Sequence, residues 1–384
     1  MKRHGFRANS RRFLLLTTRL HDWHLAKGAK LAPFAGYDMP ISYPTGAIEE
    51  HLICRRSVGL FDIDHMGQVE VSGPGADAFV SGLVSARVLD MADGDARYSL
   101  LLDEKGLVLD DLFVYRLPGR WWIVVNASNR ATDVQWMRAR APKGVVVDDR
   151  SDDTYMIAVQ GPRAIELLGA VGEGGAGLAG RISDLRRFTA GEIGVGGTKA
   201  LFGRTGYTGE DGGELFFPAD HALEVWELLI AEGRKRGIET VPIGLAARDS
   251  LRFEAGMPLH GHEISPSINA IEAGFKWACD FEKEFIGKAA LQAIVAAGPK
   301  RRLVGLDVTG GVPREGCAVL TPQGAPAGVC VAGMFCPSVK KYVANAFVFP
   351  EFSKVGTVTA VSIRDKPREA IVVKRPLYVP AYRR

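Results

Sequence analysis

The pattern of the sequence changes near residue 290, and this change constrains the fold more than any other feature. Before it, helical and strand patterns alternate irregularly, which is typical of an α+β protein and not of a doubly wound sheet. After a helical run at 289–297, Gly and Pro separate short strand-like runs, which predict a small β-barrel or sandwich. We therefore expect a region of two intertwined α+β domains at 20–295 and a C-terminal β-barrel domain at 296–384. The strand-like runs are 303–308, 318–320, 327–332, 344–348, 357–363 and 370–373.

The region before the boundary also predicts a split βαβ, ferredoxin-like unit. Two strand patterns are joined by Asp103-Glu104-Lys105-Gly106, a hairpin turn with Gly at its last position. The expected strands are 68–72, 98–102, 107–117 and 121–125, and the expected helices are 76–84 and 131–140. Gly-rich stretches at 172–180 and 194–197 lack the Lys-Ser/Thr ending of a phosphate-binding loop, so we expect plain loops there.

Charge and hydropathy exclude several classes of partner. The chain of 384 residues has 48 basic and 44 acidic side chains, a net charge of +4 that is too small to indicate nucleic-acid binding. No apolar run approaches the ~20 residues needed to cross a bilayer, so we expect no membrane association. His260 and His262 are expected in a loop, and we predict no metal site.

The cysteines indicate a reducing compartment. Their number is odd and none forms a CxxC pair, which predicts buried free thiols and not a disulfide framework. A cytoplasmic location follows, or the mitochondrial matrix if the source is eukaryotic. The cysteines are Cys54, Cys279, Cys317, Cys330 and Cys336.

The first 19 residues form a basic N-terminal extension. Six basic residues precede the first acid, and only a short apolar patch, 13–16, interrupts them. Such a segment is either a disordered extension or an organelle transit peptide, and both interpretations stay open. A secretory signal fits poorly because the apolar run is too short.

Two adjacent carboxylates lie inside an apolar strand pattern at 107–114. Successive strand residues point to opposite faces, so Asp110 and Asp111 face different sides. Both sides are apolar, and we expect the strand to be buried on both. A buried carboxylate needs a partner or a function, and burial raises its pKa. At least one of the two is therefore a candidate for proton handling or for stabilising a cation.

Two further segments carry candidate binding groups. The sequence GYTGEDG at 206–212 predicts a tight polar loop that could present a carboxylate to a ligand, although a plain surface turn is the simpler interpretation. Residues 244–256 predict a helix that Gly256 ends. Arg248 and Arg252 lie one turn apart on it. Because Asp249 can pair with Arg252, Arg248 remains available for a carboxylate ligand.

Taken together and in order, these segments resemble the aminomethyltransferase family, the T-protein of the glycine cleavage system. The matching segments cover about residues 20–382, and although each is weak alone, their order is specific. They are AGYDMP at 35–40, FDIDHM at 61–66, 106–112, AVQGP at 158–162, GYTGEDG at 206–212, ARDSLRFEAG at 247–256, FIGK at 285–288 and RPLYVP at 375–380.

The resemblance implies a three-domain cloverleaf around a central folate site. It implies transfer of an aminomethyl carbon from the lipoyl arm of H-protein to tetrahydrofolate, with release of ammonia and formation of methylenetetrahydrofolate. Tetrahydrofolate would be the co-substrate and lipoylated H-protein the partner. We expect a monomer or a weak dimer that takes part in glycine catabolism and one-carbon metabolism.

The resemblance also implies roles for individual residues. Asp110 matches the family's catalytic carboxylate, which contacts the attacking folate nitrogen and stabilises an iminium-like intermediate. Glu210 matches a residue that hydrogen-bonds the pterin ring. Residues expected to meet the anionic side of the folate are Arg248 and Arg364, and those expected in the pocket wall are Met66, Asn126 and Tyr207. Trp277 is expected either to stack on the ligand or to lie in the core.

Departures from the family pattern keep two alternatives open. Asp64 stands where the family has serine, Leu107 where it has glycine, and the segment 333–338 differs from the usual SGTxSP. These changes favour a folate-dependent demethylase of a small N-, O- or S-methyl compound as one alternative. The other is a non-catalytic folate-binding factor for iron–sulfur maturation, whose KGCYxGQE-type segment this chain lacks.

Overall fold

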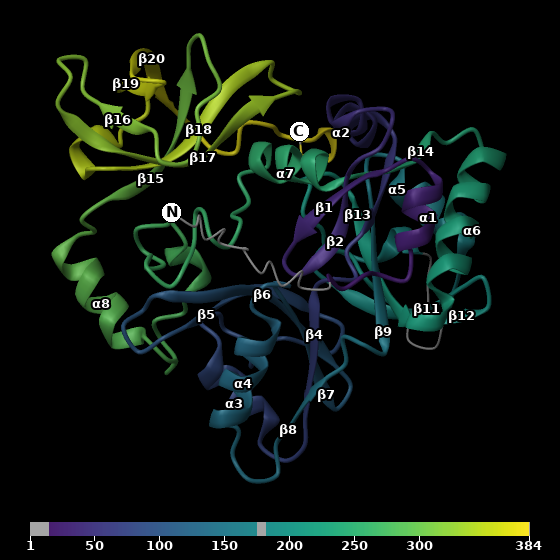
Figure 1. Cartoon of the computed structure of the whole chain (residues 1–384). Helices are drawn as coiled ribbons and strands as arrows, with labels where there is room; N and C mark the ends of the chain where they lie inside the picture. Colours follow the sequence, from purple (N-terminus) through teal and green to yellow (C-terminus); the bar gives the residue numbers. More distant parts are fainter. Residues whose placement is uncertain (1–14, 175–181, 384) are drawn as a thin grey trace, which may run out of the picture.

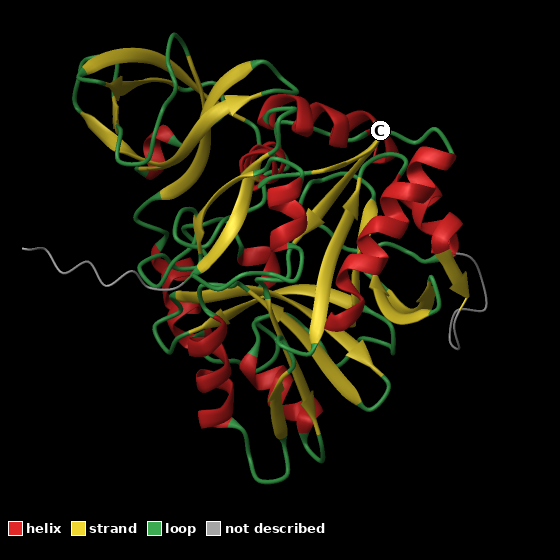
Figure 2. Ribbon diagram, turned by 45° about the vertical axis from the view of Figure 1, so that its right-hand side comes forward, coloured by secondary structure: helices red, strands yellow, loops and turns green. Residues whose placement is uncertain are grey.

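A computed structural model describes residues 15–174 and 182–383, which form three layered units that meet at the centre of the molecule (Figure 1). The ferredoxin-like unit lies at the bottom of that view, the unit built on a larger sheet at the right, and the barrel at the top left. Helices cover mainly the outer faces of the sheets, as the turned view in Figure 2 shows. The expected α+β class is confirmed.

The ferredoxin-like unit pairs its strands antiparallel in the order β5-β6-β7-β4-β8. Without β5, the order β8-β4-β7-β6 with two crossover helices is the split βαβ arrangement predicted from the sequence. Figure 1 shows β5 and β6 towards the centre, with both helices on the far side. Its elements are β4 (Gly67–Ser72), α3 (Ala76–Leu83), β5 (Ala96–Leu102), β6 (Val108–Leu117), β7 (Arg120–Val125), α4 (Arg130–Arg140) and β8 (Val146–Asp149).

The larger sheet has the order β10-β11-β12-β13-β9-β3-β14 and buries both of its faces. One face packs on helix α6, which presents Val225, Trp226 and Leu229 from one side, as an amphipathic helix does. Its strands are β3 (Val58–Asp62), β9 (Thr154–Gln160), β10 (Gly172–Gly174), β11 (Ala190–Val195), β12 (Thr198–Gly203), β13 (Gly212–Pro218) and β14 (Thr240–Pro242). Its helices are α2 (Ala47–Arg56), α5 (Ala164–Val171), α6 (Ala222–Lys235) and α7 (Leu245–Glu254).

The opposite face of the larger sheet packs against the ferredoxin-like sheet. Phe61, Met156 and Phe216 from the larger sheet share one apolar cluster with Tyr115 and Trp122 from the other. Alternation along the strands explains this arrangement, because neighbouring residues of β9 serve the two different cores. Helices α2 and α7 close the same cluster and bring polar residues of α7 towards the centre.

The C-terminal strands form a closed barrel in the order β15-β18-β17-β16-β19-β20. This confirms the predicted β-barrel, and helix α8 (Lys288–Ala297) leads into it. Closure leaves no strand edge unpaired, which stabilises a small all-β unit. Its strands are β15 (Arg302–Val308), β16 (Ala318–Leu320), β17 (Pro326–Cys336), β18 (Lys341–Val348), β19 (Val358–Ile363) and β20 (Lys366–Val373).

Two expectations about irregular segments need correction. The stretch 172–180 is not simply a loop, because Gly172–Gly174 pairs with β11 as strand β10, while 175–181 lies outside the described residues. The stretch 194–197 is a loop only at 196–197, because its first two residues end strand β11 and pair with β12. The end of the basic extension packs on the body of the protein, since Thr18 is buried and donates to Asp62 at 2.6 Å. Residues 1–14 lie outside the described part.

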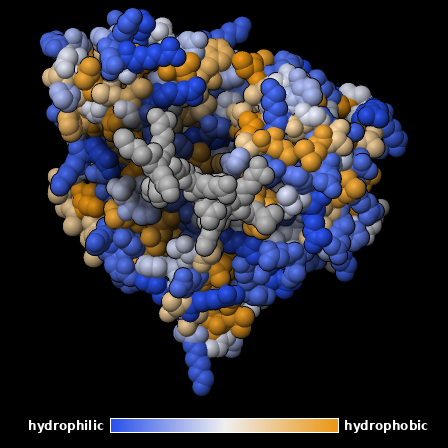
Figure 3. All heavy atoms as spheres, in the orientation of Figure 1, coloured by the Kyte–Doolittle hydropathy of each residue, from blue (hydrophilic) through white to orange (hydrophobic). Residues whose placement is uncertain are grey.

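Helix α1 (His21–Ala26) packs on the core of the larger sheet through Trp23. The hairpin of β1 (Lys30–Phe34) and β2 (Tyr37–Ser42) forms a separate two-stranded sheet. Hydrophilic atoms cover most of the face seen in Figure 3, with hydrophobic atoms in scattered patches. Among the described residues, none of the helices is long and apolar enough to cross a membrane. All five cysteines are free, and four of them are buried, as predicted.

Candidate functional site

Strand β6 carries its two adjacent carboxylates to faces with different environments. Asp110 shares the fully buried face with Val108 and Leu112, whereas Asp111 lies on a partly exposed face with Phe113. The expectation that the strand is buried on both sides is therefore wrong for one side. On that side Leu109, Asp111 and Phe113 are each only partly buried.

Asp110 is held beneath the first turn of α4. Its side chain is 0% exposed, and its two oxygens accept hydrogen bonds from the Asn126 backbone N–H at 2.8 Å, the Asn126 amide at 2.8 Å and the Asn129 amide at 2.7 Å. Hydrogen bonds to a charged group contribute about 1.5–3 kcal/mol each, so three of them offset the several kcal/mol that burying a carboxylate costs. Asp110 is thus a satisfied buried anion.

A third carboxyl completes this cluster. Asp133 of α4 is 1% exposed and lies within hydrogen-bonding reach of Asp110. Its Oδ2 has no hydrogen-bond partner among the described residues. Burial, followed by the negative charge of Asp110, raises the pKa of Asp133 to about 10.

Asp111 faces the centre and has few donors. The Asn126 amide bridges the two strand carboxylates, donating to Asp111 Oδ1 at 2.8 Å, and the Tyr98 hydroxyl lies beside the same carboxyl. Burial and the charge of Asp110 raise the pKa of Asp111 to about 7. A carboxyl whose pKa is raised towards neutral can both give and take a proton under physiological conditions.

Aromatic rings extend this face of the sheet. Tyr98 lies opposite Phe113 across β5 and β6 and stacks on Trp277, with 5.4 Å between ring centroids. Trp277 is 69% exposed, so it is not a core residue. Its exposed ring is available for stacking on a flat ligand.

The two arginines of α7 differ sharply in their partners. Arg252 is 1% exposed and binds both Asp249, at 2.8 Å, and the buried Glu263, at 2.9 Å. The predicted Asp249–Arg252 pair is therefore confirmed. The side chain of Arg248 forms no hydrogen bond or ion pair with the residues that the structure describes, and the charges of Glu214 and Asp249 act on it only at longer range.

Arg248 belongs to the same centre as Asp111. Its guanidinium lies 4.6 Å from the centroid of the Tyr207 ring, and the Tyr207 hydroxyl donates to the Pro258 carbonyl. Asp111 in turn raises the pKa of Tyr207, after burial as the main cause, which places the two side chains near each other. We call Tyr98, Asp111, Asn126, Tyr207 and Arg248 the central cluster.

Known proteins resemble this chain over almost its whole length. Residues 20–283 match the GCVT N-terminal domain, and residues 301–378 match the glycine cleavage T-protein C-terminal barrel domain. An aminomethyltransferase from Desulforamulus reducens is 39% identical over 95% of this chain and 98% of its own length. One from Bacillus subtilis is 38% identical over 95% and 99%.

This chain belongs to the glycine cleavage T-protein family. A solved structure of the family agrees with the fold described above. The crystal structure of glycine cleavage system aminomethyltransferase T from Bartonella henselae has a TM-score of 0.87 and 34% identity, covering 95% of this chain and 99% of that one.

In this member of the T-protein family, the remaining predicted residues lie outside the central cluster. Glu210 is 4% exposed and is engaged by Arg55 at 3.0 Å, so GYTGEDG is a buried loop and not a plain surface turn. Met66 is partly buried in the cluster between the two sheets. Arg364 is exposed in the β19–β20 turn with a φ of +50°, and none of its contacts joins it to the central cluster in the described part of the chain.

The segments in which this T-protein family member departs from the family pattern are structured. Asp64 has a buried Oδ1 with no partner in the described residues, and burial followed by the nearby Asp62 raises the pKa of Asp64 to about 8. The altered segment 333–338 ends strand β17, where Ser338 accepts from Arg55 at 3.2 Å and donates its backbone N–H to Glu254 at 2.8 Å.

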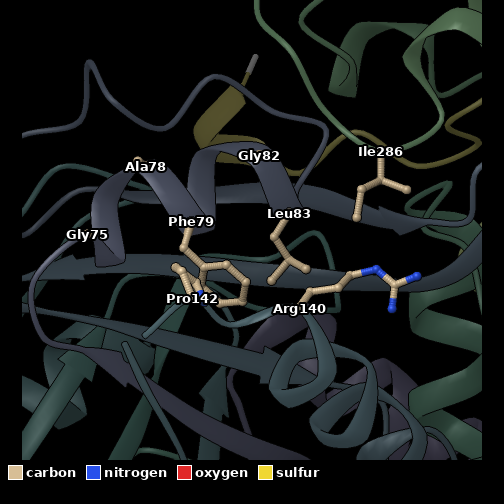
Figure 4. Close-up of a pocket in the computed structure, with 8 residues that line it drawn as sticks. All are labelled: Gly75, Ala78, Phe79, Gly82, Leu83, Arg140, Pro142 and Ile286. Carbon is tan, nitrogen blue, oxygen red and sulfur yellow. The ribbon is translucent and has the colours of Figure 1, made fainter. Parts of the chain in front are cut away.

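Two cavities lie elsewhere in the structure. One of about 610 Å³ lies beside α3, where Phe79, Leu83, Pro142 and Ile286 surround it with Arg140 at its rim (Figure 4). Another of about 520 Å³ lies between α7, α2 and β17 and is lined partly by Met334, Phe335 and Pro337 of the altered segment. Neither is lined by the central cluster, whose chemistry makes it the candidate site.

Sequence reasoning missed Tyr98 of the central cluster and the neighbouring Asp133, although the sequence contains a signal for each. Tyr98 could have been found from strand register, because it lies on the same face as Asp111 two residues from that carboxyl's partner Leu100. Asp133 could have been found from helical spacing, since Asn129 and Asp133 lie four residues apart at the start of α4.

Proposed function

We propose that this protein is a tetrahydrofolate-dependent aminomethyltransferase of the glycine cleavage system. It would take the aminomethyl carbon from the lipoyl arm of H-protein and pass it to tetrahydrofolate, forming methylenetetrahydrofolate and releasing ammonia. The observation that carries this proposal is the central cluster, in which an available carboxyl, Asp111, and an unpaired guanidinium, Arg248, come from two different units.

The guanidinium of Arg248 fits an anionic group of the folate. A partly buried arginine without a carboxylate partner favours binding of an anion, and its planar fork matches a carboxylate. Burial lowers the pKa of Arg248, but a guanidinium remains protonated at physiological pH. The nearby Arg252 cannot take this role, because two acids already occupy it.

The carboxyl of Asp111 fits the reacting end of the folate. The transferred carbon loses its bonds to sulfur, which departs as a thiol, and to its amino nitrogen, which departs as ammonia. It gains bonds to two folate nitrogens, and the two protons that these nitrogens lose pass to the departing sulfur and amine. Positive charge develops on the carbon and its nitrogen, and a carboxylate in a low-dielectric site stabilises it. We therefore propose that Asp111 contacts the substrate and that Asp110, the residue assigned by family resemblance, orients this part of the site from beneath.

The aromatic residues fit the flat pterin ring. Tyr98, Trp277 and Tyr207 offer ring faces around Asp111, and offset stacking contributes about 0.5–1.5 kcal/mol per pair. Asn126 provides an amide whose oxygen is available as an acceptor, because its N–H groups are used by the strand carboxylates. Met66, Glu210 and Arg364 remain assigned to the folate site by resemblance.

H-protein is the proposed partner, and we propose that the enzyme works as a monomer or weak dimer. The proposed reaction would take place in the cytoplasm, or in the mitochondrial matrix of a eukaryote. A second candidate is a demethylase that takes its carbon from a small methylated compound. The observation in its favour is Asp64, a buried acid with an unpartnered oxygen near Met66 where the family has serine.

The test is to incubate the purified protein with tetrahydrofolate and aminomethylated H-protein and to quantify methylenetetrahydrofolate and ammonia. We expect both products in equal amounts. A folded protein that binds tetrahydrofolate but forms no product would contradict the proposal. A parallel reaction with small N-methyl donors then distinguishes the demethylase, which would form product only there.

A further inference from the structure

The three carboxyl groups around α4 raise a problem of charge that hydrogen bonds alone do not solve. Asp110 has three N–H donors, and Asp111 has one amide donor. Asp133 lies within hydrogen-bonding reach of Asp110, yet no donor reaches its Oδ2 within the described ranges. Three negative charges so close together would repel one another strongly, because the Asp133 side chain is only 1% exposed and water cannot screen it.

A proton on Asp133 removes this conflict. A protonated carboxyl is a donor, and Asp110 is the acceptor within its reach. Two carboxyls in such contact cannot both ionise, and the one with more donors keeps the charge. Asp110 has the donors, so the proton belongs to Asp133. The unpartnered oxygen of Asp133 is then an uncharged carbonyl or hydroxyl oxygen, which is far less costly to bury than a carboxylate.

We propose that Asp133 is a positioning residue of the candidate site, whose protonated carboxyl donates a hydrogen bond to Asp110. This inference rests on the proposed function only in its kinetic consequence. With the Asp133 hydroxyl as a further donor, the single negative charge of Asp110 accepts four hydrogen bonds. That anion fixes the Asn126 amide, which bridges to Asp111, and so orients the carboxyl that faces the centre.

The charged groups described around Asp133 all favour its protonated form. Asp110 and Asp111 of β6 both disfavour its ionisation, and no cation of α4 or of the neighbouring strands offsets them. Arg130, the nearest arginine in sequence, is engaged by Asp149 at 2.8 Å and by Asp152 at 2.8 Å. The Asn129 side-chain amide donates its hydrogen bond to Asp110 and not to Asp133.

The direct test is infrared spectroscopy of the full-length protein at about pH 9. Burial raises the pKa of Asp111 to about 7 and that of Asp64 to about 8, whereas the pKa of Asp133 is raised to about 10, so of these three mainly Asp133 keeps its proton at this pH. We expect the absorption of a protonated carboxyl in the wild type and in Asp111→Asn, and its loss in Asp133→Asn. Glu166→Gln is the matched control: Glu166 also lies in the first turn of a helix but is exposed and paired with Arg163. Its variant should keep the signal.

The kinetic test separates a positioning role from simple stabilisation. Asp133→Asn retains a donor to Asp110, so kcat should stay within about threefold of the wild type. Asp133→Leu has similar size without a donor, and misplacing the Asn126–Asp111 pair should lower kcat about 10- to 100-fold, with little change in the KM for tetrahydrofolate.

Each outcome bears on the proposal. Absence of the protonated-carboxyl signal at pH 9, or its persistence in Asp133→Asn, would overturn it whether or not the protein is an aminomethyltransferase. Equal kcat values for Asp133→Leu and the wild type would also overturn it. If the wild type is inactive with every donor, the infrared result still decides the protonation of Asp133, and only the proposed function fails.

Discussion

Strand β6 and helix α7 each carry two like charges close together, and each divides them in the same way. On β6, Asp110 is satisfied within its own unit, while Asp111 faces the centre with few donors. On α7, Arg252 is satisfied by Asp249 and Glu263, while Arg248 has only the face of Tyr207. One member of each pair stabilises the fold and the other is available to a ligand.

This comparison teaches that burial alone does not identify a functional charge. Asp110 and Arg252 are the more deeply buried members, yet their hydrogen-bonding capacity is already used. The available members, Asp111 and Arg248, lie where the units meet and have fewer hydrogen-bond or ion-pair partners. If this division is correct, substitutions of Asp110 and Arg252 should lower stability. Substitutions of Asp111 and Arg248 should affect the reaction.

The largest expected effect is on the reaction, at Asp111. Asp111→Asn keeps the shape and one acceptor but cannot ionise, so it loses the stabilisation of a developing cation. We expect kcat to fall about 10²- to 10⁴-fold, the usual range for a positioned acid or base, with folate binding and stability retained. The measurement is methylenetetrahydrofolate formation under saturating substrates.

Asp110→Asn is the contrast for that variant. Its amide would place N–H groups against the N–H groups of Asn126 and Asn129, so it should unfold at lower denaturant concentration than Asp111→Asn. The division on β6 would be wrong if Asp111→Asn were the less stable of the two and kept full activity.

The second effect is on stability, at Arg252. Arg252→Met leaves Glu263 buried without its cation, which should lower the free energy of unfolding by about 3–5 kcal/mol. Arg248→Met removes an unpaired charge and should change it by less than about 1 kcal/mol. Urea unfolding followed by circular dichroism compares the two, and equal losses would show that Arg248 is structural.

The third effect is on substrate binding, at Arg248. Its loss should raise the KM for tetrahydrofolate about 10- to 150-fold, equivalent to the about 1.5–3 kcal/mol of a hydrogen bond to a charged group, with kcat nearly unchanged. Steady-state kinetics with Arg364→Met in parallel decides between the two arginines. A rise in KM only for Arg364→Met would assign the anion to the barrel hairpin.

The smallest effect is expected at Trp277. Removing its exposed ring in Trp277→Ala should weaken tetrahydrofolate binding about 2- to 10-fold, which corresponds to one stacking pair of about 0.5–1.5 kcal/mol. Trp277→Phe should restore most of the affinity because it keeps a ring over Tyr98. Unchanged affinity in Trp277→Ala, measured by calorimetry, would place the ligand away from this ring.

The fold was predictable from the sequence where local patterns are strong. The strands around 98–125 and those of the barrel follow directly from alternation and from Gly and Pro punctuation. The pairing of Asp249 with Arg252 also followed from helical spacing. The short strand β10 was missed, because three residues with glycine at both ends leave no alternation of side chains to detect.

The site was predictable only in part, because it depends on contacts between units. Strand geometry shows that Asp110 and Asp111 face opposite sides, but the face that is open depends on how the ferredoxin-like sheet packs against its neighbours. For the same reason the sequence could not show that Glu210 is engaged by Arg55, more than 150 positions away.

The measurement that tests this account most directly is a crystal structure of the protein with tetrahydrofolate. The account predicts that Asp111 and Arg248 contact the ligand, while Asp110 and Arg252 keep the partners described above. A complex in which the folate contacts Asp110 or Arg252, and leaves Asp111 and Arg248 free, would contradict the division between structural and available charges.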